Sequence, residues 1–310
     1  MPNRSDDLIG SVQPTIGKPA LVDPVAVPNM VPIWFLIVCF AFRLLTLFSL
    51  ALSPHTKLMG RLSGFMSLAP LLYLCDDKVI IDSWFHLKDA VLEGGLPFSQ
   101  AYGMNMVEYV GKDERLGGVF KDSMKEFNPI FMKKILETYK GFVGLKTLVD
   151  VGGGDGTILN MIISMYPAIK GFNYDLPYVV EKSPSYPGIE HIAGDMFVRI
   201  PKGDAIFMKW MLHSWDDKHC LMILKNCYEA LPNHGKVIVL DMVIPEAPET
   251  SLSARSLFRF DVYLMMNTNV MGKERIEKEL ESLAKEAGFS NIRVACSAFT
   301  FSVVELFKNV

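Results

Sequence analysis

The stretch "LVDVGGGDGT", residues 148–157, places four glycines between an apolar run and a run with helical spacing. Glycine lacks a Cβ, so the backbone there can adopt positive φ and approach a ligand closely. A strand that ends in such a loop and continues as a helix is typical of nucleotide-binding α/β sheets. This unit constrains the fold of the 310-residue chain more than any other feature.

After this loop the chain alternates between short β-branched runs and helical patterns, which predicts a doubly wound α/β fold. We expect a Rossmann-like, mostly parallel seven-stranded sheet that closes with an antiparallel hairpin after residue 289. In this architecture, ligands bind beyond the carboxyl ends of the strands. The predicted strands are 146–152, 170–175, 189–195, 205–210, 236–243, 291–297 and 302–308, and the main helices between them are 157–166, 218–231 and 274–288.

The part before the sheet is predicted to be mainly helical. Residues 82–95, "DSWFHLKDAVLEGG", have helical spacing and end in a glycine pair, which is a common helix stop. Residues 113–127 and 129–142 also space apolar side chains by three and four. We therefore expect three regions: an N-terminal leader with an apolar segment (1–67), a helical region (68–140) and the sheet domain (141–310).

The apolar segment "VPIWFLIVCFAFRLLTLFSLAL", residues 31–52, has the length of the ~20 residues that cross a bilayer. Its one interruption is Arg43, and a central arginine costs roughly 2.5 to 3.5 kcal/mol on insertion scales. We favour a buried helix, or a helix that meets a partner subunit, over a membrane anchor. Membrane association is left open.

Charge and cysteine content exclude several classes of protein. The net charge of -3 gives no basic footprint for nucleic acid. The five cysteines are mostly far apart and form no C-x-x-C pair, so neither a disulfide framework nor a thiolate zinc site is indicated. We expect a cytosolic protein with no metal.

The spacing of the glycines selects between two nucleotide-type ligands. A dinucleotide site favours G-x-G-x-x-G, in which the third glycine allows close packing of the helix. Here Gly152, Gly154 and Gly156 form G-x-G-x-G, and position 157 is Thr. This departure favours S-adenosyl-L-methionine (SAM) over a nicotinamide cofactor.

Chemistry-bearing residues also end the next three predicted strands. Asp175 ends the second strand, where it could accept hydrogen bonds from ribose hydroxyls; a dehydrogenase would use an acid there too. Asp195 and Met196 end the third strand and would face an adenine, while Lys209 and Trp210 end the fourth. The ordered set fits an adenosyl-plus-amino-acid ligand better than a dinucleotide.

These and other stretches resemble the plant-type, metal-independent O-methyltransferases of the caffeic acid O-methyltransferase group. The resemblance covers about residues 68–310, in order and with nearly unbroken spacing. It implies a SAM-dependent methyltransferase fold. The matching stretches are "DKVIIDSWFHLKDAVLEGG", "AYGMNMVEYVGKDER", "FMKKILETYKGF", "LVDVGGGDGT", "GFNYDLP", "SYPGIEHIAGDMF", "FMKWMLHSWDD", "LKNCYEALPNHGKVIV" and "GKERIEKELESLAKEAGF".

The resemblance implies that His213 is a general base. A phenol has a pKa near 10, so methyl transfer near neutral pH requires removal of its proton. The family flanks this histidine with two glutamates; here they correspond to Glu274 in "GKER" and to the shorter Asp241 in "VLDMVIP". The implied cofactor-binding residues are Asp150, Gly152, Gly154, Asp175, Leu176, Asp195, Met196, Lys209 and Trp210.

The implied substrate-binding residues depart from the family pattern. Ser214 stands where the family usually has Asp, and Cys75 where caffeate enzymes commonly have Asn. The substrate-side asparagine corresponds to Asn269, or to Thr268 if spacing is kept strictly. These changes argue against a strict caffeate enzyme. The remaining implied contacts are Leu74, Leu116, Phe120 and Met124, with Leu116 in place of an aromatic residue.

We therefore expect a SAM-dependent O-methyltransferase that acts on a phenolic hydroxyl of a phenylpropanoid or flavonoid, as a homodimer like its family. Family members carry a helical dimerisation domain before the position of residue 68, and residues 1–60 show none of its sequence. The alternative is a truncated, weakly active or inactive paralogue that binds SAM or pairs with a full-length relative. A nicotinamide oxidoreductase is disfavoured by the glycine spacing.

Overall fold

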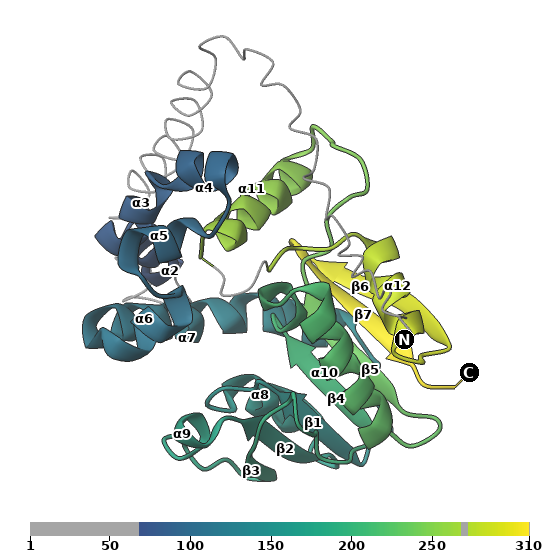
Figure 1. The fold of residues 1–310 in the computed structure, drawn as a ribbon. Coiled ribbons are helices and arrows are strands. Elements are labelled where there is room, and N and C mark those ends of the chain that lie inside the picture. Colours follow the sequence, from purple (N-terminus) through teal and green to yellow (C-terminus); the bar gives the residue numbers. More distant parts are fainter. Residues whose placement is uncertain (1–67, 268–271, 310) are drawn as a thin grey trace, which may run out of the picture. The chain divides into compact units, whose positions relative to one another are not determined.

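The computed structural model describes residues 68–267 and 272–309. Seven strands form one sheet in the order β3-β2-β1-β4-β5-β7-β6, parallel except for β7, which runs antiparallel to β5 and β6 (Figure 1). The predicted strands and the closing hairpin are confirmed. Their bounds are β1 (Thr147–Val151), β2 (Lys170–Asp175), β3 (Ile189–Ala193), β4 (Ala205–Lys209), β5 (Lys236–Asp241), β6 (Asn291–Ala298) and β7 (Phe301–Phe307).

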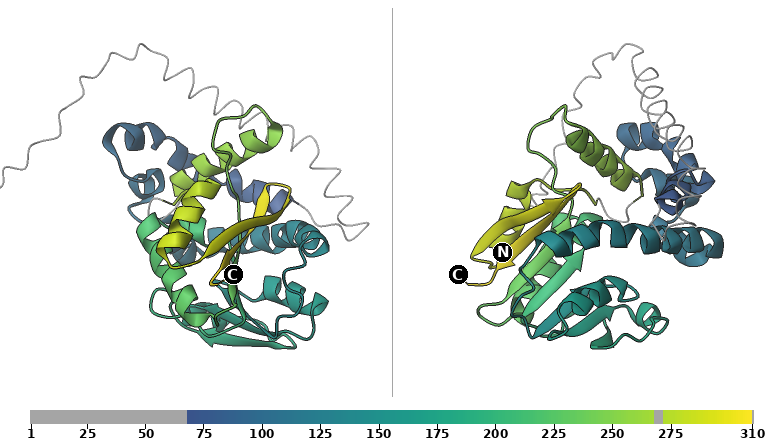
Figure 2. Two further views of the ribbon diagram at one scale, coloured as in Figure 1. Left: turned by 90° about the vertical axis from the view of Figure 1, so that its right-hand side faces the viewer. Right: turned by 180° about the vertical axis from the view of Figure 1, so that it is seen from behind.

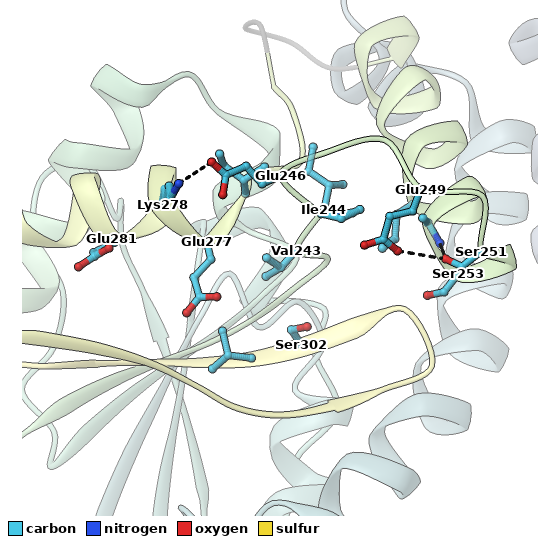
Figure 3. A pocket seen from close by; sticks show the side chains of 15 residues that line it. Val243, Ile244, Glu246, Glu249, Ser251, Ser253, Glu277, Lys278, Glu281 and Ser302 are labelled. Carbon is cyan, nitrogen blue, oxygen red and sulfur yellow. Dashed lines mark hydrogen bonds and ion pairs between the residues drawn. The ribbon is translucent and has the colours of Figure 1, made fainter.

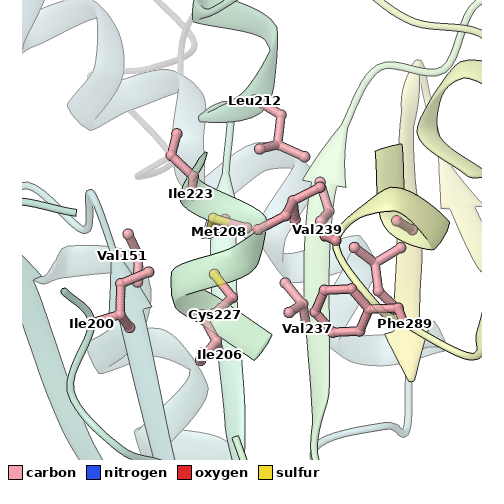
Figure 4. Close-up of a cluster of buried hydrophobic side chains, with 14 of the residues drawn as sticks. Val151, Ile200, Ile206, Met208, Leu212, Ile223, Cys227, Val237, Val239 and Phe289 are labelled. Carbon is pink, nitrogen blue, oxygen red and sulfur yellow. The ribbon is translucent and has the colours of Figure 1, made fainter. Parts of the chain in front are cut away.

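Helices cover both faces of the sheet, because consecutive residues of its central strands are apolar and point to opposite faces. Ile206 and Met208 of β4 pack under α10 (Asp217–Ala230) and α12 (Glu277–Glu286), and Figure 4 shows this cluster. Ala205 and Phe207 point to the other face, against α8 (Thr157–Met165) and the end of α7 (Glu114–Thr138). With both faces buried, the functional groups are left to the strand ends.

The glycine loop between β1 and α8 has the conformation that its sequence predicts. Gly152, Gly154 and Gly156 all have positive φ, between 59° and 81°. A Cβ on Gly152 would meet Cε of Met211 at 1.8 Å, and one on Gly153 would meet Oδ1 of Asn173 at 2.1 Å. Only glycine fits at these two positions, so the loop lies directly against the segment that follows β4.

The helical region before the sheet buries a small core of its own. The expected helix over 82–95 is two helices, because the chain tightens at Phe85 and His86, whose N–H groups donate to carbonyls three residues back. The second of these helices does end at Gly94, as predicted. The helices are α2 (Ala69–Cys75), α3 (Lys78–Trp84), α4 (Leu87–Glu93), α5 (Pro97–Tyr102) and α6 (Met106–Lys112).

Helix α7 joins the helical region to the sheet (Figure 2). The stretches 113–127 and 129–142 fall mostly on one helix, which continues through Pro129 and ends at Thr138, so residues 139–142 lie beyond it. Asp113 caps its start by accepting from the N–H of Leu116 at 2.8 Å. A further helix that no motif predicts, α11 (Leu252–Asn267), packs against α3 and α5. The short α9 (Pro177–Val180) follows β2.

The N-terminal predictions lie outside the described residues. These are the leader and apolar segment of residues 1–67, including 31–52 and the boundary at residue 68. The boundary between residues 140 and 141 stays a prediction; it falls between the end of α7 at Thr138 and the start of β1 at Thr147. Within residues 68–267 and 272–309, no helix combines the length and the apolar character needed to cross a membrane.

Candidate active site

The structure brings together His213, Asp241 and Glu274 at the carboxyl edge of the sheet. His213 lies on the 3-10 turn η1 (Leu212–Ser214) just past β4, Asp241 ends β5, and all three side chains are buried and line one small cavity. Nδ1 of His213 lies 3.1 Å from Oε1 of Glu274. The backbone N–H of Glu274 donates to Asp261 of α11 at 2.8 Å. Nε2 of His213 is therefore the ring nitrogen left for a substrate.

Burial controls the protonation of this cluster. It lowers the pKa of His213 to about 4, against the opposing effect of the Asp241 charge. It raises the pKa of Glu274 to about 9, with a further rise from the Asp261 charge, and the pKa of Asp241 to about 6. Near neutral pH, Glu274 therefore holds a proton beside a neutral imidazole. Losing that proton lets Nδ1–H donate to the carboxylate and frees Nε2 to accept a proton.

A stack of aromatic rings forms one wall beside His213. Trp210 has φ of +53°, a left-handed conformation that is unusual for a large side chain. Its ring stacks on His213 at 5.6 Å between centroids and on Phe260 of α11 at 5.3 Å. Phe260 stacks in turn on Tyr263 at 5.8 Å. The left-handed backbone thus brings the indole against the imidazole, within a cluster of stacked rings that also includes Phe127, 5.4 Å from Trp210.

The predicted cofactor residues gather around the first loop. Both carboxylate oxygens of Asp175 accept backbone hydrogen bonds, from Gly154 at 2.9 Å and from Leu176 at 2.7 Å. This holds the second strand's acid against the glycine loop. Asp195 is exposed after β3 and accepts from the N–H of Phe197, while Met196 is half-buried beside it. As the sequence predicts, Asp175 ends the second strand, and Asp195 and Met196 follow the third.

Asp150 is buried and Lys209 is half-buried behind the loop. Nζ of Lys209 donates to Oδ1 of Asn128 at 2.8 Å and lies 4.4 Å from the centre of the Trp210 ring. Burial lowers the pKa of Lys209 to about 7, and burial together with the Asp175 charge raises the pKa of Asp150 to about 7. Each group is costly to ionise there without a further partner.

Unpaired buried polar atoms concentrate at the same edge. Among the described residues, Oδ2 of Asp150, Oδ1 of Asp241 and Nε1 of Trp210 and Trp215 are buried without a hydrogen-bond partner. Such atoms are rare in folded proteins and mark places where a ligand supplies the partner. Carboxylate acceptors beside a close-approach glycine loop fit the ammonium and ribose groups of SAM.

Some of the predicted substrate residues lie in the core of the helical region, and others lie nearer to His213 or at the surface. Leu74 and Leu116 are buried in the core of the helical region, where their cluster packs against Tyr263 rather than His213. Ser214 is half-buried next to His213. Burial raises the pKa of the half-buried Cys75 to about 12. Phe120 is more than a third exposed and Met124 is partly buried, whereas Asn269 and its alternative Thr268 lie outside the described residues.

A larger cavity of about 550 Å³ lies on the other side of the segment that follows β5, and its lining includes none of His213, Asp241 and Glu274 (Figure 3). Its walls come from the start of α11, the start of α12 and the hairpin strands. Glu246 pairs with Lys278 across its rim at 2.5 Å. The catalytic candidates therefore do not line this cavity.

Sequence patterns did not predict Phe260, Asn128 or Arg275. Phe260 belongs to α11, whose mixed composition gives no clear helical pattern, and Asn128 sits before a proline inside α7. Arg275 follows Glu274 directly and is 2% exposed. Its place between the predicted acid Glu274 and the apolar Ile276 is the one sequence feature that could have pointed to Arg275. That feature does not indicate which atoms the guanidinium contacts.

Comparison with known proteins gives one consistent result. A family model described as the O-methyltransferase domain matches residues 84–290. Caffeic acid 3-O-methyltransferase of Prunus dulcis is 55% identical over 257 residues, which cover 83% of this chain and 70% of that protein. Esculetin O-methyltransferase of Kitagawia praeruptora is 55% identical over 258 residues, with 83% and 71% covered.

Solved structures share the fold. The crystal structure of LaPhzM has a TM-score of 0.70 at 26% identity and covers 78% of this chain and 73% of its own. Human N-acetylserotonin methyltransferase in complex with SAM has a TM-score of 0.70 at 21% identity, with 79% and 71% covered. The chain belongs to the plant caffeic acid O-methyltransferase family and is a SAM-dependent O-methyltransferase.

Proposed function

We propose that this enzyme methylates a phenolic hydroxyl of a phenylpropanoid-type compound, with His213 as the general base. The observation that carries the proposal is the buried pair of His213 and Glu274, 3.1 Å apart, with the ring of Trp210 stacked on the imidazole. Relatives named for caffeic acid and for esculetin, both small phenols, support the substrate class.

SAM supplies an electrophilic methyl group on a sulfonium. Asp175 and Asp195 would hold its ribose and adenine, and Asp150 with the glycine loop would hold its amino-acid end. Lys209, kept in place by Asn128, would close the site behind the cofactor. His213, Asp241 and Glu274 are themselves buried, so they would act on the acceptor away from bulk water.

His213 would act by taking the phenolic proton at Nε2 as the oxygen is methylated. The imidazolium that forms has its Nδ1–H directed at Glu274, whose carboxylate stabilises the new positive charge. This requires Glu274 to be ionised first, and burial raises its pKa to about 9. We therefore expect the reaction to speed up as the pH rises above neutral.

The acceptor would lie flat against Trp210 and Phe260. Offset stacking of planar rings suits an aromatic acceptor and leaves its hydroxyl to reach His213. Ser214 and Cys75 offer a hydroxyl and a thiol where the family usually has Asp and Asn. These exchanges replace an acid and an amide by weaker hydrogen-bonding groups, which favours an acceptor other than caffeate, such as a flavonoid or a partly methylated phenylpropanoid. Homodimerisation and a cytosolic location stay predictions.

A panel of phenols with isotope-labelled SAM tests the proposal. We expect transfer to at least one ortho-diphenol or flavonoid, and a loss of about 10²- to 10⁴-fold in kcat for His213→Ala, the usual range for general-base catalysis. His219→Ala is the matched control, because His219 is paired with Asp216 away from Glu274. Methylation retained by His213→Ala would remove the assigned base. Calorimetric SAM binding without methylation of any phenol would favour the alternative, a non-catalytic paralogue.

A further inference from the structure

Arg275 is a buried guanidinium that the proposed chemistry does not use. Its Nη1 donates to the carbonyl of Leu212 at 2.9 Å, and its Nη2 donates to the carbonyl of Trp215 at 2.7 Å. Asp217 accepts from Nε at 3.0 Å and from Nη2 at 2.8 Å. The side chain is 2% exposed, so these four bonds define its surroundings.

The two residues that supply these carbonyls stand on either side of His213 in the sequence. Leu212 precedes it directly and Trp215 follows two residues later, so the guanidinium spans the η1 turn that carries the imidazole. The turn's own bonds are longer, at 3.3 Å from Ser214 to Met211 and 3.2 Å from Trp215 to Leu212. Short 3-10 turns have poor hydrogen-bond geometry and hold their shape weakly. The bonds from Arg275 are thus the strongest fixed points of this turn.

The backbone of Arg275 fixes the other two members of the cluster. Its carbonyl accepts from the N–H of Ile244 at 3.1 Å, and it forms an isolated parallel bridge with Val243. This ties the segment just after Asp241 to the segment that carries Glu274. One residue therefore contacts all three segments that supply the buried acids and the imidazole.

We propose that Arg275 is a positioning residue that holds the His213 imidazole in register with Glu274 by clamping both ends of the η1 turn. The proposal rests on the proposed role of His213 as the base. A guanidinium is suited to this task because its planar fork can reach two carbonyls and a carboxylate at fixed angles, which an ammonium cannot do. An error of about 1 Å in the position of a reacting group can cost about 100-fold in rate.

The charge of Arg275 also acts on the cluster. The charged or titratable groups that act on His213 are Asp241 of β5, Glu274, Lys209 of β4 and Arg275 itself. The positive charge of Arg275 lowers the pKa of His213 and that of Glu274. Removing it raises both, so more of the pair stays protonated and the acid limb of the rate profile moves to higher pH.

The test compares Arg275→Met and Arg275→Lys with Lys278→Met, the control, in which an exposed cation three residues away is removed. We expect Arg275→Met to lower kcat about 100-fold with little change in KM for SAM, and Arg275→Lys to recover part of the loss. The acid limb should move to higher pH in Arg275→Met and stay in place in Arg275→Lys. Lys278→Met should behave as wild type.

A double-mutant cycle separates positioning from general stability. If Arg275 acts through His213, Arg275→Lys should not lower the residual rate of His213→Ala any further. Wild-type kcat and an unmoved acid limb in Arg275→Lys and Arg275→Met, with His213→Ala inactive, would overturn the inference and leave the proposed function intact. Full activity of His213→Ala would instead remove the proposed function itself. If Arg275→Met does not fold, the kinetics of Arg275→Lys and the double-mutant cycle still test whether Arg275 acts through His213.

Discussion

Glu274 and Glu305 are both buried glutamates, with exposures of 2% and 0%, yet their surroundings oppose each other. Burial raises the pKa of Glu274 to about 9. Burial also raises the pKa of Glu305, but hydrogen bonds from Lys236, Tyr139 and Arg293 outweigh it and lower the net value. The two sites flank β5, since Lys236 begins that strand and Asp241 ends it.

The difference shows what a buried carboxylate needs in order to stay ionised. Glu305 receives a bond from the Tyr139 hydroxyl at 2.6 Å and one from Lys236 at 2.6 Å, with Arg293 on its second oxygen. Glu274 has the neutral ring of His213 as its side-chain hydrogen-bond partner. A fully compensated charge stabilises the fold, whereas an under-compensated one is available for proton transfer.

The largest effect is expected for Glu305→Gln, measured as the free energy of unfolding. Removing the buried acid leaves the half-buried Lys236 without its counter-charge, so we expect a loss of about 3 kcal/mol. The rate per folded molecule should not change. Urea unfolding at neutral pH measures the loss, and Glu190→Gln, whose exposed pair with Lys170 is worth little, is the matched control.

The pH dependence of this stability follows from the lowered pKa of Glu305. Its contribution is complete above the ordinary glutamate value of 4.5 and is lost as the pH falls through the lower folded-state pKa. The gap between wild type and Glu305→Gln should therefore close on acidification. A gap that stays constant down to pH 3 would mean that the ion cluster is not its source.

The next effect is expected for Glu274→Gln, and it falls on the rate. Glutamine matches the protonated folded form and removes the cost of protonating a carboxyl that is ionised in the unfolded chain at pH 7, so the free energy of unfolding should rise rather than fall. It cannot become the anion that stabilises the imidazolium, so kcat should fall about 100-fold. Steady-state kinetics and a urea titration on the same preparation check both points. Large destabilisation with unchanged kcat would show that Glu274, like Glu305, stabilises the fold and takes no part in the reaction.

A smaller effect is expected for Asp241→Asn. Asp241 acts on His213 through its charge, which raises the pKa of the imidazole, and no hydrogen bond joins the two side chains in the described structure. Losing that charge lowers the pKa of the imidazole and makes it a weaker base, so we expect a loss of about tenfold in rate. A loss as large as that of His213→Ala would show that Asp241 holds the ring directly.

Local sequence patterns predict the sheet well, because the strands are short runs separated by helical patterns and turn residues, and the glycine loop has steric causes at Gly152 and Gly153. The base cluster was predictable through family resemblance, although His213 and Glu274 are 61 residues apart. The break between α3 and α4 was not, since it depends on hydrogen bonds to carbonyls three residues back. Spacing alone does not reveal such a change.

The contacts that orient the site were also beyond sequence patterns. The left-handed backbone of Trp210 depends on the packing of Phe260 and His213 around the indole. The fork of Arg275 depends on where two carbonyls of a distant turn lie. Leu74 and Leu116 matched substrate positions by resemblance, and the structure buries both in the helical core. In each case the sequence shows which residue is present, but it does not show where in the fold its side chain points.

The central claim is that the pair of His213 and Glu274 generates the base. Its most direct test is the pH dependence of kcat for wild type and Glu274→Gln with the same phenol. The raised pKa of Glu274 predicts that the wild-type rate climbs between neutral pH and about 9, and that Glu274→Gln is slower and nearly flat over that range. The same rising limb in both enzymes would assign it to ionisation of the phenol and contradict the claim.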